Sequence, residues 1–358
     1  MLAALWLVAE LAGADPPGII GGDYLYDSWQ RQDGLPQISV TAIVQDLRGY
    51  LWIGTGEGLA RFDGESFTVL DRRNTPQLPS NDVRALLADR DGSLWIATRR
   101  GLARRTRDRL VAYTVADGLI HDDVRCLFQS GDGSLWIGTA GGLGRRDNTT
   151  GAFEAFGAEH GLRQLAVSAI TADRSGVLWI GTDGGLGRFE SGRFSTVYST
   201  DNGLVDNHVR ALYEDRRGDL WIGTDGGLHR LREGSLDTFT VDDGLAHPVV
   251  SAFGEDEEGW LWIGTDGGLS RLDAGGLRAY GLQTLPGNSG NRVRALWRDH
   301  EGSLWVGTGL MGLLRLRRTQ LTVLGSPEGL IDEPGVDDLP GSRRRGLDRH
   351  QQRPFPAR

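Results

Sequence analysis

Four arginines occupy one place in a recurring segment, where a guanidinium could bind an anion. The segment reads V-x-A-hydrophobic, and its second position is arginine in four copies, namely Arg84, Arg125, Arg210 and Arg294. The other copies carry a hydroxyl at this position, as Thr41, Ser168 and Ser251. Because a guanidinium binds a carboxylate or sulfate through paired hydrogen bonds, arginines sharing one opening would form a basic rim for an acidic sugar. Ion pairs with nearby aspartates are the alternative interpretation, and the more common one for surface arginines.

Departures from the repeat define further candidate ligand-binding residues. The arginine of G-L-x-R recurs in every copy, so it is most simply structural, and a ligand site should use the exceptions. Arg99 and Arg100 replace the usual Asp-Gly after the LWIGT-like segment. The connections between copies add four polar side chains, which are His121, Asn207, His208 and His247. We expect these loops and connections to lie on one face and to contribute to the site.

Three patterns that could hold a metal or cofactor lack the full set of ligands. The His-Asp-Asp run at 121–123 is typical of a solvated loop. The D-x-D-G run at 89–92 resembles the start of a calcium loop, but Arg100 stands where a bidentate glutamate is needed. The G-x-G-x-G run at 54–58 has no helix after it, so it is not a dinucleotide fingerprint. We therefore predict no metal and no cofactor.

The single cysteine, Cys126, could be a nucleophile or a packing residue. It stands where sister copies carry alanine, at Ala85, Ala169, Ala211, Ala252 and Ala295. We interpret it as a small core residue. A lone cysteine also excludes an intrachain disulfide.

These candidates belong to a repeat that a tryptophan marks every 41 to 43 residues. The tryptophans are Trp52, Trp95, Trp136, Trp179, Trp221, Trp262 and Trp305. Each sits in a segment such as LWIGT, followed by G-L-x-R. A repeat of about 40 residues built of short strands is typical of propeller blades. The sequence thus predicts an all-β fold, a seven-bladed β-propeller of four-stranded antiparallel blades.

Each copy can be divided into four expected strands. V-x-A-hydrophobic is the innermost strand, because its small alanines suit the crowded axis. Aspartate and a glycine three residues later then form a type I hairpin turn. LWIGT is the second strand, G-L-x-R the third, and an aromatic segment such as 194–198 the fourth. The tryptophan and the glycine of LWIGT share one face, which the adjacent blade must cover.

The aligned copies resemble the two-component regulator propeller repeat. The shared pattern is DGL, V-x-A-I, D-x-x-G-x-LWIGT-x-GGL-x-R, over about residues 36–330. The resemblance implies the periplasmic sensor region of a bacterial receptor, usually two propellers and a β-sandwich before a membrane helix. A cytoplasmic histidine kinase or diguanylate cyclase follows, and several members sense oligosaccharides. This sequence departs from that pattern because the sandwich, the helix and the output domain do not follow the repeats.

The two ends of the chain suggest export and a disrupted reading frame. An apolar run at 2–8 precedes Ala12-Gly13-Ala14, so we predict a signal peptide over 1–14, although no basic residue precedes the run. Residues 24–29 have the pattern of a fourth strand that would close the ring, but residues 321–324 have it too, so two segments compete for one edge. We expect the propeller over 24–330 and a disordered tail over 331–358. Read one base later, permissible codons of 336–358 can spell an eighth repeat, which suggests a frameshift.

Composition excludes some function classes and leaves three open. A net charge of −9 disfavours a general nucleic-acid binder. The sequence contains no stretch of 18 or more apolar residues, which a membrane-spanning helix would need. The first hypothesis is a non-enzymatic, periplasmic sensor that binds an oligosaccharide or other small ligand and dimerises through domains that this sequence lacks. The alternatives are a propeller lyase or hydrolase acting on a polysaccharide or cyclic peptide, and a protein-binding scaffold. The lyase or hydrolase needs an acid and base on one face, and the histidines show no such spacing.

Overall fold

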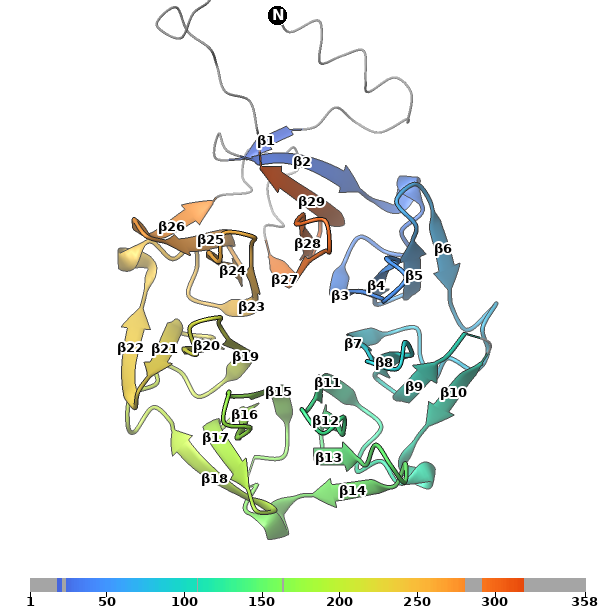
Figure 1. Cartoon of the computed structure of the whole chain (residues 1–358), viewed down its shortest axis with the longest axis horizontal. Coiled ribbons are helices and arrows are strands. Elements are labelled where there is room, and N and C mark those ends of the chain that lie inside the picture. Colours follow the sequence, from blue (N-terminus) through green and yellow to red (C-terminus); the bar gives the residue numbers. More distant parts are fainter. Residues whose placement is uncertain (1–17, 21–23, 108, 163, 281–291, 319–358) are drawn as a thin grey trace, which may run out of the picture. The chain divides into compact units, whose positions relative to one another are not determined.

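Seven antiparallel sheets surround a central axis, as the seven tryptophan repeats predict (Figure 1). The computed structural model describes residues 18–20, 24–107, 109–162, 164–280 and 292–318. The expected signal peptide, the second candidate for a fourth strand at 321–324 and the expected tail from 331 lie outside these residues. The fold class is therefore confirmed as a seven-bladed β-propeller.

The strands of a blade follow one another from the axis outwards, as expected from the sequence. The innermost strands are β3 (Val40–Gln45), β7 (Val83–Ala88), β11 (Val124–Gln129), β15 (Val167–Ala172), β19 (Val209–Glu214), β23 (Val250–Glu255) and β27 (Val293–Arg298). The second strands are β4 (Leu51–Thr55), β8 (Leu94–Thr98), β12 (Leu135–Thr139), β16 (Leu178–Thr182), β20 (Leu220–Thr224), β24 (Leu261–Thr265) and β28 (Leu304–Thr308). Blades are numbered 1 to 7 in this order.

The outer half of each blade is less regular in length. The third strands are β5 (Gly58–Phe62), β9 (Gly101–Arg105), β13 (Gly142–Arg146), β17 (Gly185–Glu190), β21 (Leu228–Arg232), β25 (Gly268–Asp273) and β29 (Leu313–Arg318). The fourth strands are β6 (Phe67–Leu70), β10 (Leu110–Tyr113), β14 (Phe153–Phe156), β18 (Arg193–Tyr198), β22 (Ser235–Phe239), β26 (Gly276–Tyr280) and, in blade 7, β2 (Tyr24–Trp29).

The remaining elements are short. β1 (Gly18–Ile20) pairs with β2. Single 3-10 turns follow four of the fourth strands, as η2 (Arg31–Asp33), η3 (Val115–Asp117), η4 (Ala158–His160) and η5 (Val241–Asp243). No helix within the described segments has the length and hydropathy needed to cross a bilayer.

The ring closes through the N-terminal strand, as residues 24–29 predict. β2 pairs with β29 in antiparallel register from Tyr24 opposite Arg318 to Trp29 opposite Leu313. The Asp27 carboxylate accepts hydrogen bonds from Nε of Arg315 at 3.0 Å and from its terminal nitrogen at 2.7 Å. Blade 7 is therefore built from both ends of the described chain.

Glycine allows neighbouring blades to approach closely at LWIGT. A Cβ on Gly264 would lie 2.6 Å from Cγ1 of Val293, the first residue of the next innermost strand. The same approach joins blade 7 to blade 1, where a Cβ on Gly307 would lie 2.6 Å from Cγ1 of Val40. Both valines are fully buried, so the glycine face of one blade packs against the next.

The turn aspartate binds the tryptophan of its own blade, which the sequence argument missed. In blade 1 the Asp46 carbonyl accepts the Gly49 N–H at 2.9 Å, as expected for the turn. Its carboxylate also accepts the indole N–H of Trp52 at 2.9 Å. Six blades use aspartate for this bond and blade 3 uses Ser130, whose hydroxyl oxygen accepts the Trp136 indole N–H at 3.1 Å.

Candidate functional site

A β-bulge places the second residue of every innermost strand. The pairing register with the second strand shifts between residues one and three, so residue two has no partner in the ladder. A bulge changes the direction of a side chain relative to a regular ladder. Arg84, Arg125, Arg210 and Arg294 are therefore all bulge residues.

Three of these arginines line one cavity at the end of the channel where the innermost strands begin. The cavity has a volume of about 420 Å³, and we call it the arginine mouth. Its lining residues are Thr41, Arg84, Arg99, Asp123, Arg125, Ser168 and Arg294. The hydroxyl of Thr41 donates to the Val83 carbonyl at 2.7 Å, and Ser168 donates to the carbonyl of Val209. Both hydroxyls are therefore used to join neighbouring blades.

Two of the three bulge arginines in this cavity form ion pairs with nearby aspartates, and the third does not among the described residues. Arg84 Nε lies 3.2 Å from Asp82, and Arg125 Nε lies 3.5 Å from Asp123. Arg294 has neither an ion pair nor a hydrogen bond from its side chain among the described residues. Desolvation, followed by the positive charge of Arg292, lowers the pKa of Arg294, although Asp266 opposes this. A bound anion would be favourable beside this guanidinium.

Arg210 lies in a separate ion-pair cluster and does not line the arginine mouth. It forms an ion pair with Asp225, which lies in the loop between β20 and β21 of the same blade. Asp225 also contacts His208 Nδ1 at 3.1 Å, and His208 Nε2 lies 3.2 Å from Asp183. Burial raises the pKa of Asp225, but the Arg210 hydrogen bond and charge outweigh it and lower the pKa overall. Arg210 is therefore already neutralised.

The other predicted site residues have roles in local structure. His121 Nδ1 accepts the Asp123 N–H at 2.9 Å, and His247 Nδ1 accepts the Val249 N–H at 3.1 Å. Asn207 Oδ1 accepts the Thr200 N–H at 2.8 Å. Arg100 is exposed and does not line the arginine mouth. The structure thus brings Arg84, Arg99, Arg125 and Arg294 together and leaves the other candidates outside this cavity.

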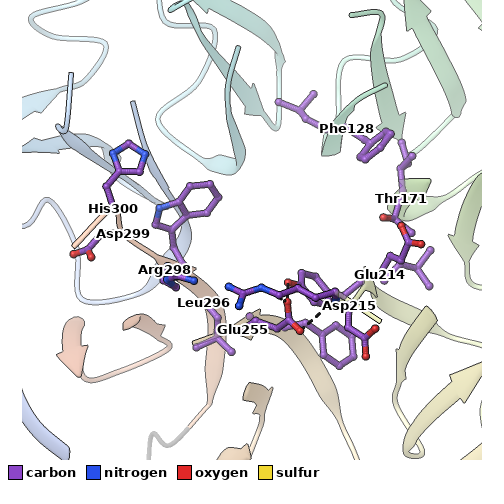
Figure 2. Close-up of a pocket in the computed structure, with 17 residues that line it drawn as sticks. Phe128, Thr171, Glu214, Asp215, Glu255, Leu296, Arg298, Asp299 and His300 are labelled. Carbon is purple, nitrogen blue, oxygen red and sulfur yellow. Dashed lines mark hydrogen bonds and ion pairs between the residues drawn. The ribbon is translucent and has the colours of Figure 1, made fainter. Parts of the chain in front are cut away.

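A larger cavity at the opposite end of the channel was missed by the sequence argument. It has a volume of about 1040 Å³ and is lined by the last residues of the innermost strands and by their turns. We call it the aromatic mouth, because Phe128, Tyr213, Phe253 and Trp297 contribute their rings to it. Figure 2 shows Phe128, Glu214, Glu255 and Leu296 around one open space.

Polar groups in the aromatic mouth are only partly satisfied. The Tyr213 hydroxyl donates to Glu255 at 3.2 Å, and Arg216 Nε lies 3.4 Å from the same carboxylate. Desolvation and then the negative charge of Glu255 raise the pKa of Tyr213. Trp297 Nε1 and Arg298 Nε are buried without a hydrogen-bond partner. The fifth residue of the innermost strand differs from copy to copy, from Gly254 to Trp297, and this variation was the signal in the sequence that could have indicated the mouth.

The described residues contain neither a metal cluster nor an activated thiol. No group of three His, Cys, Asp or Glu side chains among them could hold a metal ion. Burial raises the pKa of the Cys126 thiol to about 12, so the thiol stays protonated at neutral pH. Cys126 packs in the core of blades 3 and 4 with Phe128 and Val167.

A family model describes five of the repeats. The model for the two-component regulator propeller matches residues 77–100, 118–141, 161–184, 203–226 and 244–267. Each match runs from the connection between blades to the loop that follows the second strand. The chain is also 44% identical to histidine kinase P4 of Formosa agariphila over 55 residues. These 55 residues make up 15% of this chain and 4% of that protein.

Solved propellers share the fold at low sequence identity. The extracellular domain of BT3049 from B. thetaiotaomicron, described as a hybrid two-component system, has a TM-score of 0.72 and 24% identity over 82% of this chain and 42% of that one. Virginiamycin B lyase from Staphylococcus aureus has a TM-score of 0.64 and 16% identity over 82% of this chain and 98% of the lyase. The chain spans less than half of the BT3049 extracellular domain, and its match to the kinase covers a small part of that protein.

Proposed function

We propose that this chain, which carries repeats of the two-component regulator propeller family, is the ligand-sensing propeller of a two-component-type receptor. It resembles the extracellular domain of such a system in fold, and its repeats match the family model. In this proposal the propeller is exported to the periplasm and carries no catalytic activity. Signalling then depends on domains beyond the repeats, through which two receptor copies associate.

The proposed ligand is an acidic oligosaccharide, bound at the arginine mouth. The observation that carries this proposal is the convergence of four arginines on one cavity of about 420 Å³, with Arg294 lacking any ion pair among the described residues. A uronate carboxylate or a sugar sulfate can accept paired hydrogen bonds from a guanidinium. Because Arg84, Arg125 and Arg294 come from three blades, one ligand would bridge them and favour one arrangement of a receptor dimer.

Calorimetric titration with an acidic and a neutral trisaccharide tests the proposal. We expect saturable binding of trigalacturonate and none of maltotriose. Arg294→Gln should weaken binding by about tenfold or more, because a hydrogen bond to a charged group contributes about 1.5–3 kcal/mol. Arg100→Gln is the matched control and should bind as the unaltered protein does. Equal binding of both sugars, or full binding by the Arg294 variant, would overturn the proposal.

The same titration separates the sensor from the enzyme. The virginiamycin B lyase shares the fold alone at 16% identity, so it makes a lyase a second possibility to test. Chromatography of the titrated trigalacturonate should return the intact sugar. Cleavage products that require the protein would favour a lyase or hydrolase. Binding of a protein partner at this mouth in place of sugars would favour a scaffold.

A further inference from the structure

Three arginines with mutually interacting charges lie where blade 1 meets blade 2. Arg61 is the cross-strand partner of Trp52, and its guanidinium carbon lies 4.5 Å from the ring centroid of Tyr50. Arg105 belongs to β9 of blade 2, but its guanidinium carbon lies 4.8 Å from the ring centroid of Trp52. Arg48 is the third residue of the first turn of blade 1. We call Arg48, Arg61 and Arg105 the junction arginines.

None of the junction arginines has an ion pair with a described carboxylate. Arg61 donates one long hydrogen bond of 3.4 Å to the Thr68 hydroxyl, and its Nε is buried without a partner. Desolvation, and then the positive charges of Arg61 and Arg48, lower the pKa of Arg105, although the charge of Asp46 opposes this. The nearby Asp46 carboxylate is already occupied, since it accepts the Trp52 indole N–H and the backbone N–H of Arg48.

The next junction has arginines at the equivalent two strand positions and a carboxylate in addition. Arg104 and Arg146 flank Trp95, with guanidinium carbons 5.2 and 5.3 Å from its ring centroid. Asp91, the third residue of the first turn of blade 2, forms an ion pair with Arg104. The equivalent residue in blade 1 is Arg48. One junction therefore supplies an anion from its own chain, whereas the other has a further cation in that place.

We propose that the junction arginines bind one oxyanion, a phosphate or sulfate group, near the place that the Asp91 carboxylate takes at the next junction. Such a group presents several acceptor oxygens to guanidinium N–H donors. The rings of Tyr50 and Trp52 lie against the guanidinium groups of Arg61 and Arg105 and shield one side of each from water, which strengthens the attraction. The junction lies beside the first turns, at the opposite end of the strands from the arginine mouth. It is therefore a second site, independent of the proposed sensor ligand.

The oxyanion could be a free ion or an ester group on a larger molecule. Comparing the binding of inorganic ions with that of a small phosphate ester distinguishes these two sources. Inorganic phosphate, inorganic sulfate and methyl phosphate are titrated into the whole chain by calorimetry at constant ionic strength. We expect one anion to bind per chain. Methyl phosphate that binds as tightly as inorganic phosphate indicates an ester, and binding of the inorganic ions alone indicates a free ion.

Two variants taken from sister blades test the residues. Arg48→Asp copies Asp91, and Arg105→Leu copies Leu231 of blade 5. Each should weaken phosphate binding by about tenfold or more, because it removes a charged donor. Arg146→Leu at the next junction is the matched control and should leave binding unchanged. No saturable binding to the unaltered protein, or unchanged binding to Arg48→Asp, would overturn the proposal.

Thermal unfolding provides a second measurement that does not depend on the heat of binding. In chloride buffer Arg48→Asp should melt at a higher temperature than the unaltered protein, because an internal carboxylate replaces a repelling cation. Sulfate stabilises most proteins by exclusion from their surface, so only the difference between the two proteins is informative. Added sulfate should narrow that difference. A difference that stays constant would contradict the site.

Discussion

The aspartate that opens each first turn performs two tasks, which explains why it recurs. In blade 6 the carbonyl of Asp256 accepts the N–H of Gly259 and closes the turn. Its carboxylate accepts the Trp262 indole N–H at 2.9 Å, and both side chains are buried. The sequence reveals the turn because Asp and Gly are turn formers. It does not reveal the indole bond, which depends on how the turn lies over the second strand.

Removing this acceptor should destabilise the propeller. Asp256→Ala leaves the Trp262 indole N–H buried without a partner, so we expect a loss of about 1–3 kcal/mol in the free energy of unfolding. Asp256→Ser should lose less, because Ser130 performs the same task in blade 3. Urea unfolding followed by tryptophan fluorescence measures both. Equal losses for the two variants would argue against the hydrogen bond as the cause.

A buried histidine makes stability depend on acidity. His229 is fully buried in blade 5, where Nε2 accepts the Val205 N–H at 3.3 Å. Burial lowers its pKa to about 4, whereas the unfolded chain has a pKa of about 6.5. Between these values the unfolded state binds the extra proton, so stability falls as pH drops from about 6.5 to about 4, by about 3 kcal/mol in total.

A matched substitution isolates this histidine from the carboxylates. In blade 6 the hydroxyl of Ser270 accepts the Ala246 N–H at 2.9 Å, at the position equivalent to His229. His229→Ser therefore keeps an acceptor and removes the titrating group. Unfolding measured at pH 7 and pH 5 should show a smaller acid loss for this variant. An unchanged acid loss would assign the effect to other groups.

At the scale of the element, the strands follow from the sequence and the bulges do not. Alternating LWIGT segments and fixed turns define four strands per repeat, because each residue type suits its place in a strand or a turn. The bulge after Val40 and its six equivalents carry no distinctive residue, since threonine, serine and arginine all occupy it. The repeated position suggests that these side chains share one opening, but the residue types alone do not determine the direction in which they point.

The contact between glycine and valine of adjacent blades should tolerate little added volume. In Gly264→Ala the new Cβ would meet Val293 at 2.6 Å, so we expect a loss of about 1–3 kcal/mol from overpacking. Ala97 takes this position in blade 2, and Ala97→Gly is the comparison variant. Chemical unfolding of both proteins measures the effect. A Gly264 variant as stable as the unaltered protein would show that the blades can separate without cost.

At the scale of the whole molecule, the sequence predicted the ring but only one of its two mouths. Seven equal repeats and a fourth strand at the start of the chain indicate closure. The aromatic mouth arises because Phe128, Tyr213 and Trp297 come from different blades and meet only in the closed ring. Each looks like an ordinary strand residue in its own repeat, and only a comparison of the repeats shows that the fifth position of the innermost strand varies.

Closure by β2 should dominate the stability of the ring. Tyr24 is buried and accepts a hydrogen bond from Arg271 at 3.0 Å, and Trp29 stacks on Trp305 with ring centroids 5.3 Å apart. A chain that begins at Gln30 loses both rings, so we expect a cost of at least about 3–5 kcal/mol. A chain that begins at Gly18 is the control. Thermal melting compares them, and equal melting temperatures would contradict this role of β2.

The order of synthesis gives this closure a further consequence. The ribosome makes β2 before any complete blade, but its partner β29 emerges only after six blades have been made. During that interval the inner edge of β2, which later pairs with β29, has no mate and can pair with another nascent copy. Bringing together segments so distant along the polypeptide is slow. Misassembly between neighbouring chains should therefore compete with maturation until translation of the last blade is complete.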